Sequence, residues 1–405
     1  MATVALTGAA SAGNLTIESW RNDDATIWKD QIIPAFMTRH PNITVKFNPT
    51  APKDYNATLN ARLEGGTAGD IITCRPFDAS LELFNKGQLA ALNDLPGMAN
   101  FSDVAKSAWT TDDGKSTFCV PMASVIHGFI YNKDIFKELG LEPPRTEEEF
   151  LGLLEKVKAH GTYTPLVLGT NDQWEAATLG FQNLGPSYWK GEEGRKGLID
   201  GTAKLTGKAY VGTFAALAKW APYMGDGYKA QTYRDSQNLF GLGKGAIYVA
   251  GSWDIAAFRG QNVNMGAFKA PPPAGQSDCY ISDHSDIGIG MNAKTPNAAN
   301  ARVFLDWSGS EEFAGIFANA LPGHFPPSNA KVTISDDVAQ EFISWRGQCK
   351  STIRNSSQIL SRGTPDLESE MWNVSAQVLN GTMTPDAAAA QLEDGLKKWY
   401  APHQK

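Results

Sequence analysis

The sequence predicts an α/β protein built from two lobes, and three observations support this prediction. Segments with the two-residue period of strands alternate with segments of helical period over residues 15–92. The alternation starts again after a long apolar stretch at residues 118–132. A chain of 405 residues, with 42% hydrophobic and 20% charged residues, is also long enough for two or three domains and apolar enough to form their cores.

The first part of the chain alternates strands with helices. Branched residues alternate in "LTIESW", which predicts a strand ending at Trp20, and the spacing of apolar residues then predicts a helix over 23–40 with Asp23 or Asp24 as N-cap. The same reasoning predicts a strand at 42–47, a helix at 55–66, a buried strand at 70–74 and a helix at 79–92. This order is typical of a parallel sheet with helices on its faces.

The second part of the chain repeats the alternation. The apolar segment 118–132 is expected to be interrupted at Pro121 and Gly128, and residues 146–161 have the caps of a helix, with Thr146 before it and Gly161 after it. The later elements are a strand at 164–169, helices through 212–224, a strand at 286–292, a helix at 298–309 and a helix-rich C-terminal part. A proline cluster at 271–273 is expected to mark a crossing between the lobes. More than one crossing is therefore predicted.

Charge and termini limit the classes of partner. The net charge is −7 and no basic run is present, which argues against a nucleic acid or an anionic membrane as partner. Residues 1–12 end in a small-x-small pattern, so we expect them to be the remnant of an export signal; a frayed terminus of small residues is the alternative. No later segment reaches the roughly 20 apolar residues of a membrane span. A soluble exported protein is expected.

Cysteine and glycine motifs give no sign of a cofactor. The four cysteines leave three full pairings open, and none lies in a C-x-x-C motif, which argues against a zinc or redox site. The segment "GLGKGA" at 241–246 matches a dinucleotide fingerprint in its letters, but a helical stretch precedes it and a strand follows it. Because the fingerprint needs the opposite order, nucleotide binding is not expected.

Catalytic and metal motifs are equally weak. The six histidines are scattered, and neither a metalloprotease motif nor a serine-hydrolase motif is present. "SDHSD" at 282–286 could supply metal ligands, although a polar loop before a strand explains it better. No pair of carboxylates stands out for glycoside hydrolysis.

Several segments resemble the family 1 extracellular solute-binding proteins, which deliver sugars to bacterial ABC importers. The most specific match is "VPMASVIHGFIYNKDIFKELGLEPPRTEEEF", and "FGLGKGAIYVAGSW" is a second one. "AFMTRHPNITVKF", "GGTAGDIIT" and "NGTMTPDAAAAQL" are similar to other family segments, so the resemblance runs from Leu15 to about Trp399. The segment Cys74–Pro76 lies where relatives vary widely, which leaves the identity of the ligand open.

The resemblance implies a periplasmic binding protein-like fold of two Rossmann-like lobes joined by a multi-segment hinge. Lobe 1 is expected to comprise 13–121 and 279–320, and lobe 2 to comprise 122–278 and 321–405. It also implies a sugar held in a cleft that closes on binding, with Trp253 facing that cleft from a strand end. By the same layout, a disulfide is expected to join Cys74 to Cys119 rather than Cys279 to Cys349, which would lie in different lobes.

The candidate ligand residues are aromatic and polar side chains, most of them at the ends of predicted strands, where open α/β lobes bind ligands. Indoles stack on the C–H faces of sugars, and polar side chains suit the hydroxyl rims. The residues expected to bind the ligand are Trp20, Asn22, Asp23, Arg75, Asp78, His127, Gln173, Trp174, Trp253, Asp283, His284 and Arg362.

Each candidate has a structural alternative. The three tryptophans could instead belong to the core, and Asp23 and Asp78 could cap the helices that follow them. His127 could bond a backbone carbonyl, and Arg362 could form a surface ion pair.

The function predicted from the sequence is capture of a carbohydrate in the periplasm by a monomer that delivers it to a membrane ABC permease. No catalysis, cofactor or metal is expected. One alternative is a secreted glycosidase or lyase; another is a binding protein for a polyol, an opine-like solute or a sulfonated sugar.

Overall fold

The computed structural model describes residues 12–405 and divides them into two compact units. Unit 1 comprises residues 12–123, 285–321 and 326–333, and unit 2 comprises residues 124–284, 322–325 and 334–405. Apart from residue 12, the predicted export signal lies outside the described residues. Within residues 12–405, no helix combines the length and the apolar character required to cross a bilayer.

The units do not divide at the predicted positions. The chain leaves unit 1 within strand β4 (Val120–Asn132), after Ala123, and re-enters it within strand β8 (Tyr280–Met291), at Ser285 rather than at Cys279. The proline cluster 271–273 therefore lies within unit 2, and the crossing predicted there was wrong. The chain also changes unit after Leu321, after Phe325 and after Thr333.

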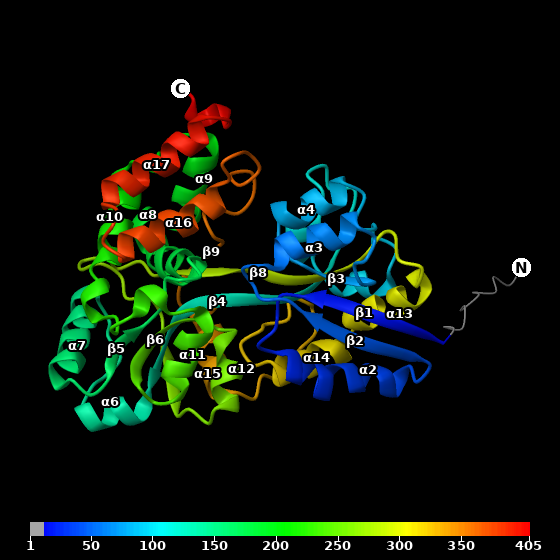
Figure 1. Cartoon of the computed structure of the whole chain (residues 1–405), viewed down its shortest axis with the longest axis horizontal. Helices are drawn as coiled ribbons and strands as arrows, with labels where there is room; N and C mark the ends of the chain where they lie inside the picture. Colours follow the sequence, from blue (N-terminus) through cyan, green and yellow to red (C-terminus); the bar gives the residue numbers. More distant parts are fainter. Residues whose placement is uncertain (1–11) are drawn as a thin grey trace, which may run out of the picture. The chain divides into compact units, whose positions relative to one another are not determined.

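Unit 1 is built on a parallel sheet, as its sequence predicts. Strand β1 pairs in parallel with both β2 and β3, and β3 pairs antiparallel with the second half of β8. Helices α3 and α4 lie on one side of β1 and β3, and α2 and α14 lie on the other (Figure 1). The bounds are β1 Gly13–Ser19, β2 Ile43–Pro49, β3 Ile71–Cys74, α1 Ala25–Ile27, α2 Ile33–Arg39, α3 Tyr55–Glu64, α4 Asp78–Asn85, α5 Asp103–Lys106, α13 Ala298–Ser308 and α14 Glu311–Ala320.

Two helices of unit 1 differ from prediction. The helix expected over 23–40 contains a π-helical turn, Trp28–Ile32, between α1 and α2. Pro34 follows that turn at the start of α2, and because proline lacks an N–H it cannot continue the regular hydrogen-bond ladder. The helix expected over 79–92 ends at Asn85, before Gly87 with its positive φ of 68°.

Unit 2 contains the strands β4, β5, β6, β7 and β9. Strand β6 pairs in parallel with β5 and antiparallel with β4, and β7 pairs with the other edge of β4. The bounds of the strands are β5 Thr164–Val167, β6 Gly245–Gly251, β7 Met265–Phe268 and β9 Lys350–Thr352. Figure 1 shows α6 and α7 beside β5, and α11, α12 and α15 beside β6.

The helices of unit 2 form a large apolar core with these strands. Helices α8, α10, α16 and α17 pack on one another in a separate layer (Figure 1). The bounds are α6 Lys133–Leu139, α7 Glu147–His160, α8 Gln182–Trp189, α9 Glu192–Asp200, α10 Lys208–Ala218, α11 Tyr233–Gly241, α12 Asp254–Gly260, α15 Asp337–Ser344, α16 Leu367–Leu379 and α17 Pro385–Lys397.

Helix α7 and strand β4 test two local predictions for unit 2, of which one is confirmed and one is wrong. The caps of α7 are confirmed: the Thr146 hydroxyl accepts from the Glu149 N–H, and Gly161 adopts a left-handed conformation. The expected break of 118–132 is wrong, because β4 runs without interruption through Pro121 and Gly128. Gly128 allows a close approach there, since a Cβ would lie 2.7 Å from the Trp345 ring.

Both cysteine pairs form disulfides. Cys74 bonds Cys119 within unit 1, as expected, and Cys279 bonds Cys349 within unit 2. The second pairing was not expected, because the resemblance implied that Cys279 lies in lobe 1 and Cys349 in lobe 2. The crossing within β8 lies beyond Cys279, so both cysteines of this pair belong to unit 2.

Candidate functional site

In unit 2, the loops after β5 and β6 bring several predicted residues together. These two strands are parallel, so their carboxyl ends lie at the same edge of the sheet. Trp174 follows β5, and Trp253 follows β6. His127 lies on β4 directly opposite Gly251, the last residue of β6. Four aromatic residues from four segments, which we call the aromatic cluster, meet here: His127, Trp174, Tyr233 and Trp253.

Trp253 is the centre of the aromatic cluster. Its indole is only 7% exposed, and its Nε1–H donates to the Tyr233 hydroxyl at 3.0 Å. The His127 ring packs edge-on at 5.4 Å between centroids. One face of the indole lies against Gly251, where a Cβ would come within 2.1 Å of the ring. Trp253 is therefore an ordered, largely buried indole rather than an open surface platform.

Tyr233 was not among the predicted residues, although it connects the two tryptophans. Its ring meets Trp174 edge-on at 4.8 Å, and its hydroxyl donates to Asp254 Oδ1 at 2.6 Å. A local signal was available, because Thr232 and Asp235 have the spacing of a capping box and the structure forms that box. It places Tyr233 at the first position of α11, where an aromatic side chain can reach the neighbouring strand ends.

Asp254 and Glu175 are buried acids beneath the aromatic cluster. Asp254 accepts hydrogen bonds from the Tyr233 and Tyr248 hydroxyls, from the Gln237 amide and from the Gly251 N–H. Burial raises the pKa of Glu175 well above its usual value, and the negative charges of Asp172 and Asp254 act in the same direction. The neutral form of Glu175 is therefore favoured in the fold.

Two buried histidines pair beside the aromatic cluster. His127 Nε2 and His284 Nε2 are 3.1 Å apart, so one ring donates and the other must accept with an unprotonated nitrogen. Burial lowers the pKa of His127 to about 3, and the positive charge of Arg354 acts in the same direction. Both predicted histidines thus lie together, and His127 is neutral at physiological pH.

Three other predicted residues of unit 2 have different surroundings. Asp283 accepts from Arg346 through both carboxylate oxygens, at 2.8 and 2.7 Å, which commits its charge to an internal ion pair. Gln173 is exposed beside Trp174, with a positive φ of 64°. Arg362 is exposed in the loop before α16, where its positive charge acts on Tyr400.

In unit 1, Trp20 and Arg75 meet at the carboxyl ends of β1 and β3, which are also parallel. The Arg75 guanidinium lies 4.6 Å from the Trp20 ring centre, and Tyr55 packs edge-on against Trp20 at 5.5 Å. Arg75 also donates to Asn56 Oδ1 and to the Pro52 carbonyl, each at 2.8 Å. Tyr55 is a second residue that the sequence analysis missed.

The remaining predicted residues of unit 1 follow β1 and β3. Asn22 is exposed, and Asp23 accepts from the buried Arg21 at 3.2 Å. Of the two N-cap candidates, Asp24 occupies the N-cap position of α1. Its carboxylate pairs with Arg21 and accepts no hydrogen bond from a backbone N–H of the helix. Asp78 does not cap α4, because Phe77, with a φ of 62°, occupies the N-cap and places Asp78 in the first turn.

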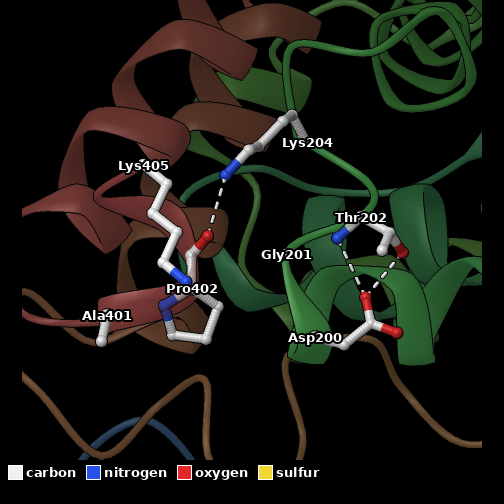
Figure 2. A pocket seen from close by; sticks show the side chains of 7 residues that line it. All are labelled: Asp200, Gly201, Thr202, Lys204, Ala401, Pro402 and Lys405. Carbon is white, nitrogen blue, oxygen red and sulfur yellow. Dashed lines mark hydrogen bonds between the residues drawn. The ribbon is translucent and has the colours of Figure 1, made fainter.

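A surface pocket of about 320 Å³ lies elsewhere in unit 2, and none of the predicted residues lines it. Figure 2 shows three hydrogen bonds within it: Lys204 donates to the Pro402 carbonyl, and Thr202 donates to Asp200 through its N–H and its hydroxyl. These internal bonds leave the aromatic cluster as the better candidate for a ligand site in unit 2.

Comparison with known proteins decides the family. The model of the bacterial extracellular solute-binding proteins matches residues 21–314. The chain belongs to this family.

Among curated relatives of this solute-binding protein, an uncharacterized ABC transporter extracellular-binding protein of Pyrococcus horikoshii is 24% identical over 398 residues, covering 90% of the chain and 78% of the relative. The multiple sugar-binding protein of Streptococcus mutans is 25% identical over 302 residues, covering 70% and 68%.

Solved structures share the fold. The bacterial solute receptor AcbH, described as preferring β-D-galactopyranose, has a TM-score of 0.83 at 21% identity, covering 96% of this chain and 99% of its own. RafE, solved with raffinose, has a TM-score of 0.77 at 19% identity, covering 97% and 100%. The α/β architecture expected from the sequence is thus confirmed.

Proposed function

We propose that this solute-binding protein captures a neutral carbohydrate in the periplasm, as a monomer, and delivers it to the membrane permease of an ABC importer. The observation that carries the proposal is the aromatic cluster at the carboxyl ends of β5 and β6. Family membership supports the binding role, and relatives described as sugar-binding support the class of ligand.

The chemistry of the aromatic cluster suits a sugar. Indole and phenol rings offer flat apolar faces to the C–H groups of a pyranose, and their polar edges can bond hydroxyl groups. Beside the rings, His127 is uncharged, and Asp254 is held by hydrogen bonds from Tyr233, Gln237 and the Gly251 N–H. A neutral ligand therefore fits unit 2 better than a strongly charged one.

A thermal-shift panel tests this proposal. The panel contains D-galactose, D-tagatose, raffinose, stachyose and chitin oligosaccharides, with polyols and sulfonated sugars as the alternative classes. A ligand at 100 times its dissociation constant should stabilise the fold by about 2.7 kcal/mol. Recovery of the intact sugar after long incubation distinguishes binding from hydrolysis or lyase chemistry. Stabilisation by a polyol or a sulfonated sugar alone, or cleavage of the sugar, would overturn the proposal.

A further inference from the structure

Trp253 is held by a hydrogen-bond relay of three side chains that joins two segments of unit 2. The indole N–H donates to the Tyr233 hydroxyl at 3.0 Å, and that hydroxyl donates to Asp254 Oδ1 at 2.6 Å. All three side chains are buried. The relay therefore links the end of β6, where Trp253 lies, to the start of α11, where Tyr233 lies.

The direction of the relay follows from the groups themselves. An indole nitrogen can only donate, and an ionised carboxylate can only accept. The Tyr233 hydroxyl is the one group of the three that can do both, so it must orient its proton toward Asp254 and present a lone pair to Trp253. Phenylalanine at position 233 would keep the ring but would leave the indole N–H without this acceptor.

Tyr233 is itself fixed independently of Trp253. Its backbone N–H donates to Asp172 Oδ2 at 3.1 Å, and Thr232 and Asp235 form a capping box around the start of α11. Its ring also rests against Trp174. A residue held at its backbone and at its ring can impose an orientation on the neighbouring indole.

We infer that Tyr233 is a positioning residue, which fixes the indole plane of Trp253 and thereby sets the affinity for the bound sugar. This inference rests on the proposed function, because it assigns a role within the same site. Tyr233 acts through Trp253 and need not touch the sugar.

The relay can be tested without any ligand. The indole ¹H–¹⁵N resonance of Trp253, identified by its loss in Trp253→Phe, should shift upfield and exchange faster with solvent in Tyr233→Phe. Tyr248→Phe is the matched control, because Tyr248 is also buried and its hydroxyl reaches the same Asp254 Oδ1, at 3.5 Å, from strand β6. It should leave the Trp253 resonance in place. An unmoved resonance in Tyr233→Phe would overturn the relay.

The effect on binding is measured by calorimetry with the sugar that gives the largest shift in the panel. Tyr233→Phe should weaken binding about three- to tenfold, the net effect of one hydrogen bond, whereas Tyr248→Phe should stay within about twofold. In a Trp253→Phe background, Tyr233→Phe should cause no further loss, since no indole N–H remains to be positioned.

The remaining outcomes separate the two proposals. A shifted Trp253 resonance in Tyr233→Phe with unchanged affinity would overturn the positioning role. A further loss of affinity on adding Tyr233→Phe to Trp253→Phe would also overturn it, because it would indicate direct contact of Tyr233 with the sugar. If no sugar of the panel binds the unmodified protein, the proposed function fails and the positioning role fails with it. Failure of the positioning role alone leaves sugar binding by the unmodified protein intact.

Discussion

At the scale of single residues, the site depends on close packing around a few buried side chains. Gly251 permits the indole of Trp253 to lie on the backbone, and Glu175 lies beneath the aromatic cluster as a buried acid. Because Trp253 is buried, its replacement by alanine should lower the free energy of unfolding by about 3–5 kcal/mol, in addition to any loss of affinity. Smaller substitutions around it are therefore more informative.

Gly251→Ala should displace the Trp253 indole. The added Cβ would lie 2.1 Å from the ring, so the indole must move, and the free energy of unfolding should fall by about 1–3 kcal/mol. Gly260→Ala is the control, because nothing lies within 4 Å of a Cβ there, at the end of α12. Denaturant melts and sugar titrations measure both effects. Equal behaviour of the two variants would contradict the packing described for Trp253.

Glu175→Gln should change how stability depends on pH. The raised pKa of Glu175 means that the folded protein keeps a proton that the unfolded chain releases. This stabilising contribution is complete below the unfolded pKa of about 4.3 and is lost as pH rises toward the folded pKa, by at most about 1.4 kcal/mol per pH unit. Glutamine does not titrate, so the variant should gain stability relative to the unmodified protein between pH 5 and 8. A constant difference across this range would show that Glu175 is not perturbed.

At the scale of elements, strand ends and disulfides hold the loops of each unit. β9 pairs in parallel with the start of β8, from Tyr280 opposite Lys350. The Cys279–Cys349 disulfide joins the residues just before these two strands. Because β9 has only three residues, this covalent link contributes substantially to keeping the strand in place.

Replacing Cys279 and Cys349 together by serine should destabilise unit 2. The bond closes a loop of 70 residues, and losing such a link costs about 2–5 kcal/mol, largely through the entropy of the unfolded chain. The double serine variant of Cys74 and Cys119, whose separation is 45 residues, provides the comparison in unit 1. Peptide mapping without reduction should recover both pairs. Four free thiols, or unchanged denaturation midpoints, would refute this role.

At the scale of the whole molecule, the chain passes between its two units within β4 and within β8. A few strand residues that cross between two compact bodies form the type of connection at which hinge motion occurs. A ligand that binds one arrangement of the two units more tightly than another shifts the population toward that arrangement, and for two-lobed binding proteins this is a closed one.

Small-angle X-ray scattering should therefore show a smaller radius of gyration when the best sugar of the panel is present at saturation. The unmodified protein without sugar serves as the unliganded control. An unchanged radius for the saturated protein would rule out closure as the mechanism of capture.

The sequence by itself determined the order of the elements and the position of Trp253 at a strand end. Periodicity and capping are local, because they depend on residues a few positions apart. They account for the strands of unit 1, the caps of α7 and the order of helix before strand around "GLGKGA". The tertiary structure decided which side chains meet. His127 and His284 are 157 residues apart, and Asp283 and Arg346 are 63 apart. Three further features likewise depend on which strand ends the fold places side by side: the role of Tyr233, the continuity of β4 through Pro121 and the Cys279–Cys349 bond. No local pattern in the chain specifies these contacts.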